Sequence, residues 1–324
     1  MCGKFNKIES LKKADLHRHI EGAVAPEAIY KLYRKSNNGQ KVKYFRKKMV
    51  LTRRAKSLDK FIDKLGTRFM KKYAATIDDL IFVFKQGIRD AALDNVNYLE
   101  LRFALSNFLD LETNPAVLVK KINLAIEEES KKQGIITKLL ITLKRDDDKS
   151  INFKIVKLAK GLYKSGDIAG LDLAGNEHFY PNNLFVEMAK EIKKAEIPLT
   201  VHAGEVTNAE SVATAVNHLF ARRIGHGTRA AFDKSVMELL VRKNILLEVC
   251  PTSNLDTSAY KTYEEVPIRT LLDNKVPIII CTDDPVTSNI NLSWEVNNLI
   301  KRKIITPEEY ERMLISAQSF YFNP

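Results

Sequence analysis

The sequence predicts an α/β fold, a TIM (β/α)8 barrel with extra helices inserted after the first strand. Eight short runs rich in β-branched residues alternate with longer amphipathic stretches, an order typical of a parallel sheet covered by helices. Eight such strand–helix units can close a barrel. Polar motifs also follow the ends of most of these runs, and barrel folds gather functional residues at the carboxyl ends of their strands.

Each expected strand is a short apolar run between polar or turn-forming residues. The eight runs cover residues 14–20, 96–103, 135–143, 168–173, 197–202, 223–226, 245–250 and 276–282. Amphipathic periodicity predicts helices between them, for example over residues 115–132, 151–164, 182–194, 209–220, 233–243 and 266–274. We treat residues 1–324 as a single domain, because no linker, low-complexity tract or internal repeat interrupts the alternation.

The gap between the first two strands breaks this regular spacing. It spans about 75 residues, too long for a structureless loop, so we expect extra helices over about residues 26–92. Within it, residues 41–72 hold thirteen Lys or Arg against Asp59 and Asp63, which leaves the rest of the +12 chain nearly neutral. This basic segment is either a solvated, lysine-rich surface or a lid that attracts phosphate or another anion.

The composition is that of a globular protein, with 45% hydrophobic and 28% charged residues. No apolar run approaches the roughly 18 residues of a membrane-spanning helix, and the charged N-terminus lacks the apolar core of a signal peptide. Cys2, Cys250 and Cys281 form no CxxC pair, which argues against a disulfide framework or a thiolate zinc site. We therefore expect a cytoplasmic protein without membrane partners.

Four of the six histidines are concentrated in short motifs at the ends of expected strands. These motifs are DLHRHIEG at residues 15–22, VHAGE at 201–205 and RIGHGT at 223–228, and a fourth motif, CTDDP at 281–285, adds two adjacent aspartates. Histidine is scarce in this chain, so packing alone explains such clustering poorly. Neutral imidazoles combined with one carboxylate are a ligand set that zinc selects.

We expect His17, His19, His202 and Asp283 to bind one Zn²⁺ ion together with a water molecule. His17 and His19 stand two apart, so a strand places both side chains on the same face. Each residue taken alone is more often a hydrogen-bonded structural residue than a ligand. All four occupy matching strand ends, and this coincidence favours the metal site.

Three further residues can supply acid and base groups beside such a metal. Glu205 follows an Ala-Gly turn, His226 lies between two glycines, and Asp284 comes directly after an expected ligand. Alternatively, Glu205 is a surface turn residue, His226 makes a structural hydrogen bond, and Asp284 supports the neighbouring backbone. A metal lowers the pKa of bound water from about 15.7 toward 7, and His226 and Asp283 can orient that water and take its proton. A protonated Glu205 can donate to a leaving or ring nitrogen, so we expect hydrolysis at an sp² carbon that bears an amine.

These motifs, together with ELRFALS (100–106), GLDLAGNE (170–177) and LEVCPTSN (247–254), resemble the adenosine deaminase family, in family order. The resemblance implies a zinc-dependent barrel that converts a 6-aminopurine to its 6-oxo counterpart and releases ammonia. It implies that a small purine nucleoside, most simply adenosine or 2′-deoxyadenosine, is the substrate and that nucleic acid is not a partner.

The resemblance also implies residue roles, which we carry over by motif position. The zinc ligands correspond to His17, His19, His202 and Asp283, while His19 and Glu21 also match positions that contact substrate. The remaining roles are protonation of ring nitrogen 1 by Glu205, positioning of the attacking hydroxide by His226, contact with nitrogen 3 by the Gly175 amide, contact with nitrogen 7 by Asp284, and a structural role for Arg102.

Three departures from the family pattern, and one residue that fits it, bear on the substrate. Glu21 stands where adenosine-specific members usually carry aspartate, and Asn176 replaces the usual acid after the LAG motif. Gly225 favours nucleoside deaminases, since adenine-specific members tend to have aspartate there. The basic segment at 41–72 also departs, and it suits a phosphorylated substrate. Adenine, N-methylated AMP and other modified adenine nucleosides therefore stay open as alternatives.

Other protein classes fit the sequence less well. A binuclear amidohydrolase usually needs a bridging lysine or acid from the fourth strand, and IAGLDLAG offers no lysine. Deaminases that act on bases in tRNA or DNA carry H-x-E and P-C-x-x-C motifs, which this chain lacks. A nucleic-acid- or membrane-surface-binding protein with a vestigial barrel has support only from the charge of residues 41–72. The oligomeric state is left open.

Overall fold

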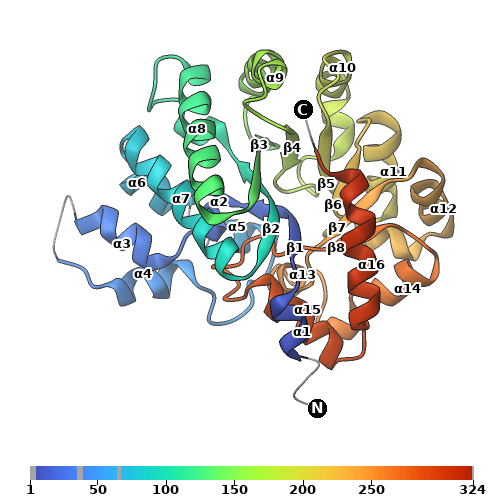
Figure 1. Ribbon diagram of the computed structural model, residues 1–324. Coiled ribbons are helices and arrows are strands. Elements are labelled where there is room, and N and C mark those ends of the chain that lie inside the picture. Colours follow the sequence, from blue (N-terminus) through green and yellow to red (C-terminus); the bar gives the residue numbers. More distant parts are fainter. Residues whose placement is uncertain (1–4, 35–38, 64–66, 323–324) are drawn as a thin grey trace.

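The protein is an eight-stranded parallel barrel surrounded by helices, as the sequence predicts (Figure 1). The computed structural model describes residues 5–34, 39–63 and 67–322. The strands pair in chain order, and a bridge between Arg18 and Asp283 joins the last strand to the first. They are β1 (Lys13–His19), β2 (Val96–Phe103), β3 (Ile136–Lys144), β4 (Gly170–Ala174), β5 (Leu199–Ala203), β6 (Arg223–His226), β7 (Leu246–Val249) and β8 (Ile278–Ile280).

The predicted strands and helices are confirmed. Strand ends differ from the expected ones by at most two residues. The expected helix at 182–194 begins as a 3₁₀ turn, Asn182–Phe185, before α10. The helices that follow β2 to β8 are α8 (Pro115–Gln133), α9 (Lys149–Lys164), α10 (Val186–Lys194), α11 (Ala209–His218), α12 (Lys234–Lys243), α13 (Pro251–Asp256), α14 (Ile268–Asp273), α15 (Leu292–Lys301) and α16 (Pro307–Ala317), and α1 (Phe5–Ser10) precedes β1.

The gap between β1 and β2 is filled by helices, as expected. They are α2 (Ile20–Ala23), α3 (Pro26–Arg34), α4 (Val42–Met49), α5 (Leu58–Ile62), α6 (Thr67–Tyr73) and α7 (Ile77–Leu93). Helices α3 and α4 project to one side of the barrel, whereas α7 lies beside α8 (Figure 1). Residues 35–38 and 64–66 of the expected insertion lie outside the described residues.

The strands are almost entirely buried because helices cover the outside of the barrel and side chains fill its interior. All residues of β4 to β8 are buried, and most of them are aliphatic. No helix in the described part of the chain has the length and apolar character needed to cross a membrane. The barrel thus forms a rigid frame whose carboxyl strand ends meet at one rim.

Candidate active site

The structure brings the four expected metal ligands together at the carboxyl rim of the barrel. His17 and His19 lie at the end of β1, His202 lies in β5, and Asp283 follows β8. Backbone hydrogen bonds hold the end of β1 against the segment after β8: the Asp283 N–H donates to His17 O at 2.8 Å, and the His19 N–H donates to Asp283 O at 2.9 Å. The hydrogen bonds that join the two ends of the barrel therefore also hold His17, His19 and Asp283 together.

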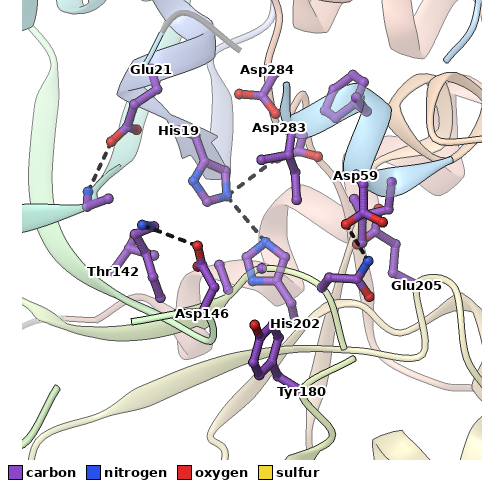
Figure 2. Close-up of a pocket in the computed structure, with 18 of the residues that line it drawn as sticks. His19, Glu21, Asp59, Thr142, Asp146, Tyr180, His202, Glu205, Asp283 and Asp284 are labelled. Atoms are coloured by element: carbon purple, nitrogen blue, oxygen red, sulfur yellow. Dashed lines mark hydrogen bonds and ion pairs between the residues drawn. The ribbon is translucent and has the colours of Figure 1, made fainter. Parts of the chain in front are cut away.

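The spacing of the donor atoms fits a single small metal ion. Donor atoms held at about 2.0–2.1 Å from a tetrahedral Zn²⁺ lie about 3.3 Å from one another. His19 Nε2 lies 3.2 Å from His202 Nε2, and Asp283 Oδ1 lies 3.4 Å from His17 Nε2 and 3.5 Å from His19 Nε2. Figure 2 shows His19 joined by dashed lines to His202 and Asp283. Donor atoms of His17, His202, His226 and Asp283 lie within 4.8 Å of one another, and so do those of His19, Asp172 and His202, so the cluster can hold a metal.

Carboxylates behind two of the histidines set their orientation. His17 Nδ1 lies 2.9 Å from Glu248 Oε2 in β7, and His202 Nδ1 lies 3.0 Å from Asp172 Oδ1 in β4. A proton on each Nδ1 leaves a lone pair on each Nε2, the atom that would bind a metal, although Arg102 Nη1 lies 3.3 Å from His17 Nε2. The buried Arg102 guanidinium forms ion pairs with both carboxylates, at 3.2 Å to Asp172. The predicted structural role of Arg102 agrees with this position.

The ionisation of the histidines also suits a metal. Burial lowers the pKa of His19 to about 3 and lowers the pKa of His202, so both imidazoles are neutral and able to donate a lone pair at neutral pH. His17 differs: burial and Arg102 act against its charge, but the carboxylates of Asp283 and Glu248 outweigh them and raise its pKa. A metal cation between His17 and Asp283 would take the place of that proton.

Glu205 and His226 face each other beside this cluster. His226 Nε2 lies 3.7 Å from Glu205 Oε2 and 3.7 Å from Asp283 Oδ2, and all three side chains are buried. Burial raises the pKa of Glu205 well above its usual value, and the charge of Asp283 raises it further. Burial also holds the pKa of His226 well below its usual range. The site thus pairs a carboxyl group whose surroundings favour its protonated form with an imidazole whose surroundings favour its neutral form.

Two of these side chains depend on an unusual backbone. His226 has φ 60° and Asp283 has φ 61°, in the left-handed region that side chains other than glycine seldom occupy. His226 is the last residue of β6, and Asp283 lies three residues after the end of β8. Such conformations persist only where the surrounding structure enforces them, and they concentrate at functional sites.

Glu21, Gly175 and Asp284, expected to contact substrate, all line a cavity of about 540 Å³ above the cluster. Asp284 Oδ1 and Glu21 Oε2 are buried without a hydrogen-bond partner in the described residues. Burial, first, and then the neighbouring Asp283 raise the pKa of Asp284 well above its usual value, and burial raises that of Glu21 to about 7. Both carboxyl groups can therefore donate a proton to a bound molecule.

The described cations of the basic segment lie outside the lining of this cavity. What the segment contributes is Leu58, Asp59, Phe61 and Ile62 of α5 and the adjacent Asp63. Its two acidic residues are thus at the cavity, whereas Lys43, Lys47 and similar cations are exposed to solvent. The segment therefore forms one wall of the site. The charged side chains that it places there are negative, although the segment as a whole is positively charged.

Sequence reasoning did not single out Asp172, Glu177 or Glu248 as parts of the site. All three lie within the GLDLAGNE and LEVCPTSN motifs, so the signal was available as carboxylates in otherwise apolar segments. Glu177 accepts five hydrogen bonds, from the N–H groups of residues 204–207 and from the Ser211 hydroxyl, at 2.7–3.1 Å. It thereby holds the turn that carries Glu205.

Known proteins resemble this chain over nearly its whole length. A family model described as "Adenosine deaminase" matches residues 12–322. An adenosine deaminase of Clostridium kluyveri is 32% identical over 316 residues, which cover 96% of this chain and 89% of that protein. Among solved structures, an adenine deaminase from Arthrobacter aurescens superposes with a TM-score of 0.86 at 23% identity (97% and 94% of the two chains). The N6-mAMP deaminase of Arabidopsis has a TM-score of 0.83 at 22% identity (98% and 96%).

Proposed function

The chain belongs to the adenosine deaminase family, and we propose that it is a zinc-dependent deaminase that converts adenosine and 2′-deoxyadenosine to inosine and 2′-deoxyinosine. The observation that carries this proposal is the pairing of Glu205 with His226 beside the donor cluster. A carboxyl group and an imidazole 3.7 Å apart have their pKa values driven in opposite directions, which is the arrangement that acid–base chemistry at neutral pH requires.

We assign one zinc ion to His17, His19, His202 and Asp283. Imidazole nitrogens and one carboxylate oxygen are a ligand set suited to Zn²⁺. When bound, the ion would polarise a water molecule and lower its pKa to about 7. A second ion is disfavoured because Asp172 already contacts His202 and Arg102 through Oδ1 and accepts from Thr142 through Oδ2.

The residues of this chain would then divide the proton transfers. His226 orients the attacking water and accepts its proton, since burial keeps the imidazole neutral. Glu205 donates a proton to ring nitrogen 1, which makes carbon 6 more electrophilic. The 6-amino group then takes the proton held by His226 and leaves as ammonia, while the hydroxyl proton at carbon 6 returns to Glu205 and leaves the 6-oxo group. A protonated Asp284 donates to nitrogen 7, and the Gly175 N–H donates to nitrogen 3. These contacts orient the purine with carbon 6 toward the water.

The outer part of the cavity supports an unphosphorylated substrate. A purine held by Glu205 and Asp284 places its sugar toward the mouth, where Asp59, Asp63 and Asp146 outnumber Lys144. Hydroxyl groups can donate to these carboxylates. At the inner end, a Cβ on Gly225 would lie 2.9 Å from the His17 ring, so the aspartate typical of adenine-specific relatives has no room there.

The alternative is the same chemistry on adenine, on N-methylated AMP or on another modified adenine nucleoside. The observation in its favour is Glu21, whose longer side chain is anchored by the Ala104 N–H at 3.1 Å and leaves Oε2 free. A glutamate in this place reaches further into the cavity than aspartate would, and leaves less room beside the sugar.

An ultraviolet assay of the zinc-loaded protein on adenosine, 2′-deoxyadenosine, adenine, AMP and N6-methyl-AMP tests the proposal. We expect the highest kcat/KM on adenosine and 2′-deoxyadenosine. A preference for adenine or for N6-methyl-AMP would establish the alternative. Absence of deamination on all five substrates, with zinc content verified, would refute the proposed activity.

A further inference from the structure

The charged groups in the outer part of the cavity differ in how well they are neutralised. Asp146 lies 3.5 Å from Lys144, and Asp63 lies 3.5 Å from Lys60, so each has a cationic partner. Asp59 has no ion-pair partner among the described residues, although it lies on the same short helix as Lys60. Asp59 therefore contributes an uncompensated negative charge to the wall of the site.

The hydrogen bond that Asp59 makes is to a neutral amide. Asn176 Nδ2 donates to Asp59 Oδ1 at 2.7 Å, which ties helix α5 to the loop after β4 (Figure 2 shows Asp59 with this bond). The bond occupies one carboxylate oxygen and holds the side chain against the cavity. Because Asn176 immediately follows Gly175, Asp59 is fixed close to the residue that we expect to contact the purine.

The orientation of the Asn176 amide is set by its own backbone. Asn176 Oδ1 accepts from the N–H groups of His178 at 2.9 Å and Phe179 at 3.3 Å. The oxygen faces this turn, so the nitrogen must face Asp59. An aspartate at 176 could make the same turn but would set a second carboxylate against Asp59. The asparagine that departs from the family pattern is thus matched to the aspartate of α5.

We propose that Asp59, oriented by Asn176, is a specificity-determining residue that keeps purine nucleoside monophosphates out of this site. The inference rests on the proposed function and assigns a selectivity to the same cavity. A sugar hydroxyl can donate to the free oxygen of Asp59. A phosphate dianion in the outer cavity faces an unneutralised carboxylate instead, and juxtaposed like charges suppress binding of the wrong partner.

Two substitutions separate the charge of Asp59 from its hydrogen bond. Asp59→Asn keeps an oxygen that can accept from Asn176 and removes the charge, whereas Asp59→Glu keeps the charge. Glu238→Gln, on the exposed surface of α12, controls for loss of one negative charge elsewhere. The readout is the ratio of kcat/KM for adenosine to kcat/KM for AMP. Both substrates are measured on the same preparation, so the ratio is independent of the folded fraction.

We expect Asp59→Asn to lower this ratio about tenfold, and Asp59→Glu and Glu238→Gln to leave it within about twofold of the wild type. Inhibition constants of inosine and inosine monophosphate give the same comparison if AMP turnover is too slow to measure. Added salt should raise kcat/KM for AMP relative to adenosine in the wild type, because salt screens repulsion, and should do so less in Asp59→Asn.

Two results would overturn the inference. One is an unchanged ratio in Asp59→Asn, and the other is a wild type whose use of AMP falls with salt, as it would if cations of the basic segment bound the phosphate. If the wild type deaminates adenosine and either result is found, only the role of Asp59 is contradicted. Wild-type protein without activity on adenosine contradicts the proposed function and the inference with it.

Discussion

The Glu177 carboxylate holds Glu205 by its backbone: Glu177 Oε1 accepts the Glu205 N–H at 2.8 Å, while Glu177 Oε2 accepts the Gly204 N–H at 2.9 Å. The same carboxylate binds two further N–H groups and a hydroxyl, so one buried side chain folds the whole turn after β5. Its charge also helps to raise the pKa of Glu205. Glu177 is therefore a positioning residue for the proton donor that we propose.

Substitution of Glu177 should damage catalysis more than substrate binding. Glu177→Gln replaces one acceptor oxygen by an NH₂ group facing N–H donors, which displaces the turn and Glu205 with it. We expect kcat to fall about 100-fold with a smaller change in KM, since a misplacement of about 1 Å can cost that much. Steady-state kinetics on folded protein, verified by circular dichroism, provides the measurement.

Glu187→Gln is the matched control, because this glutamate lies on the exposed side of α10 and pairs with Lys190. The control should retain wild-type kinetics. If Glu177→Gln changed KM and kcat like the control, Glu177 would have no positioning role.

Glu205→Gln should remove the proton donor while leaving the metal cluster intact. We expect a loss of 10²- to 10⁴-fold in kcat, the range that general acid catalysis supplies. In the wild type, Glu205 is active when protonated, so kcat/KM should fall as pH rises through its raised pKa. Metal content and the pH profile should be measured together. Full activity in Glu205→Gln would argue against its role as proton donor. Because the charge of Glu177 helps to raise the pKa of Glu205, the alkaline decline should begin at lower pH in Glu177→Gln than in the wild type. An identical decline in both proteins would argue against this influence of Glu177.

The fold and the meeting of the four expected ligands at one rim were predictable because both depend on local sequence. Parallel strands are short β-branched runs, so their positions could be located to within two residues. The four expected ligands lie in short motifs at strand ends, and closure of a barrel brings all strand ends to one rim. Once the strands were located correctly, closure of the barrel was enough to predict that four residues meet: His17, His19, His202 and Asp283.

Long-range packing explains what the sequence did not reveal. Asp59 reaches the cavity because the segment before α5 is docked on α13, where the Ala55 N–H donates to Asp256 O at 2.9 Å. No periodicity in residues 41–72 encodes that contact, and the net charge of the segment fitted either a solvated surface or a lid that attracts anions. Glu177 was missed for a similar reason, since its role depends on a loop that folds around it from another strand.

Asp172→Asn should weaken metal binding without removing a ligand. Asp172 Oδ1 lies 3.0 Å from His202 Nδ1 and orients the ring, so an amide there loses the charge that supports the imidazole. We expect metal affinity to fall about 10- to 100-fold. Competition with a chelator, read by metal analysis after dialysis, measures this change. Affinity equal to that of Asp273→Asn, a change in an exposed aspartate, would contradict the orienting role.

Glu295 should make stability fall with rising pH. It is buried and accepts the Thr252 N–H at 2.8 Å, and burial raises its pKa from 4.5 to about 7. A folded-state pKa above the unfolded value gives stability that is present below pH 4.5 and is lost as pH rises through 7, up to roughly 3 kcal/mol. Urea unfolding from pH 5 to 8 should show this loss in the wild type and less of it in Glu295→Gln. Parallel pH dependences for the two proteins would refute the assignment.

Gly22→Ala should disturb Asp284 and leave the rest of the barrel in place. A Cβ on Gly22 would lie 1.8 Å from Asp284 Oδ1 and 2.4 Å from its Cβ, so the aspartate must move. Because we propose that Asp284 contacts nitrogen 7, its displacement should raise KM for adenosine and lower kcat/KM about tenfold or more. Gly161→Ala in α9 is the control: its Cβ meets nothing within 4 Å, and alanine should stabilise the helix by about 0.5–1 kcal/mol. Equal kinetics in the two variants would show that the purine does not depend on Asp284.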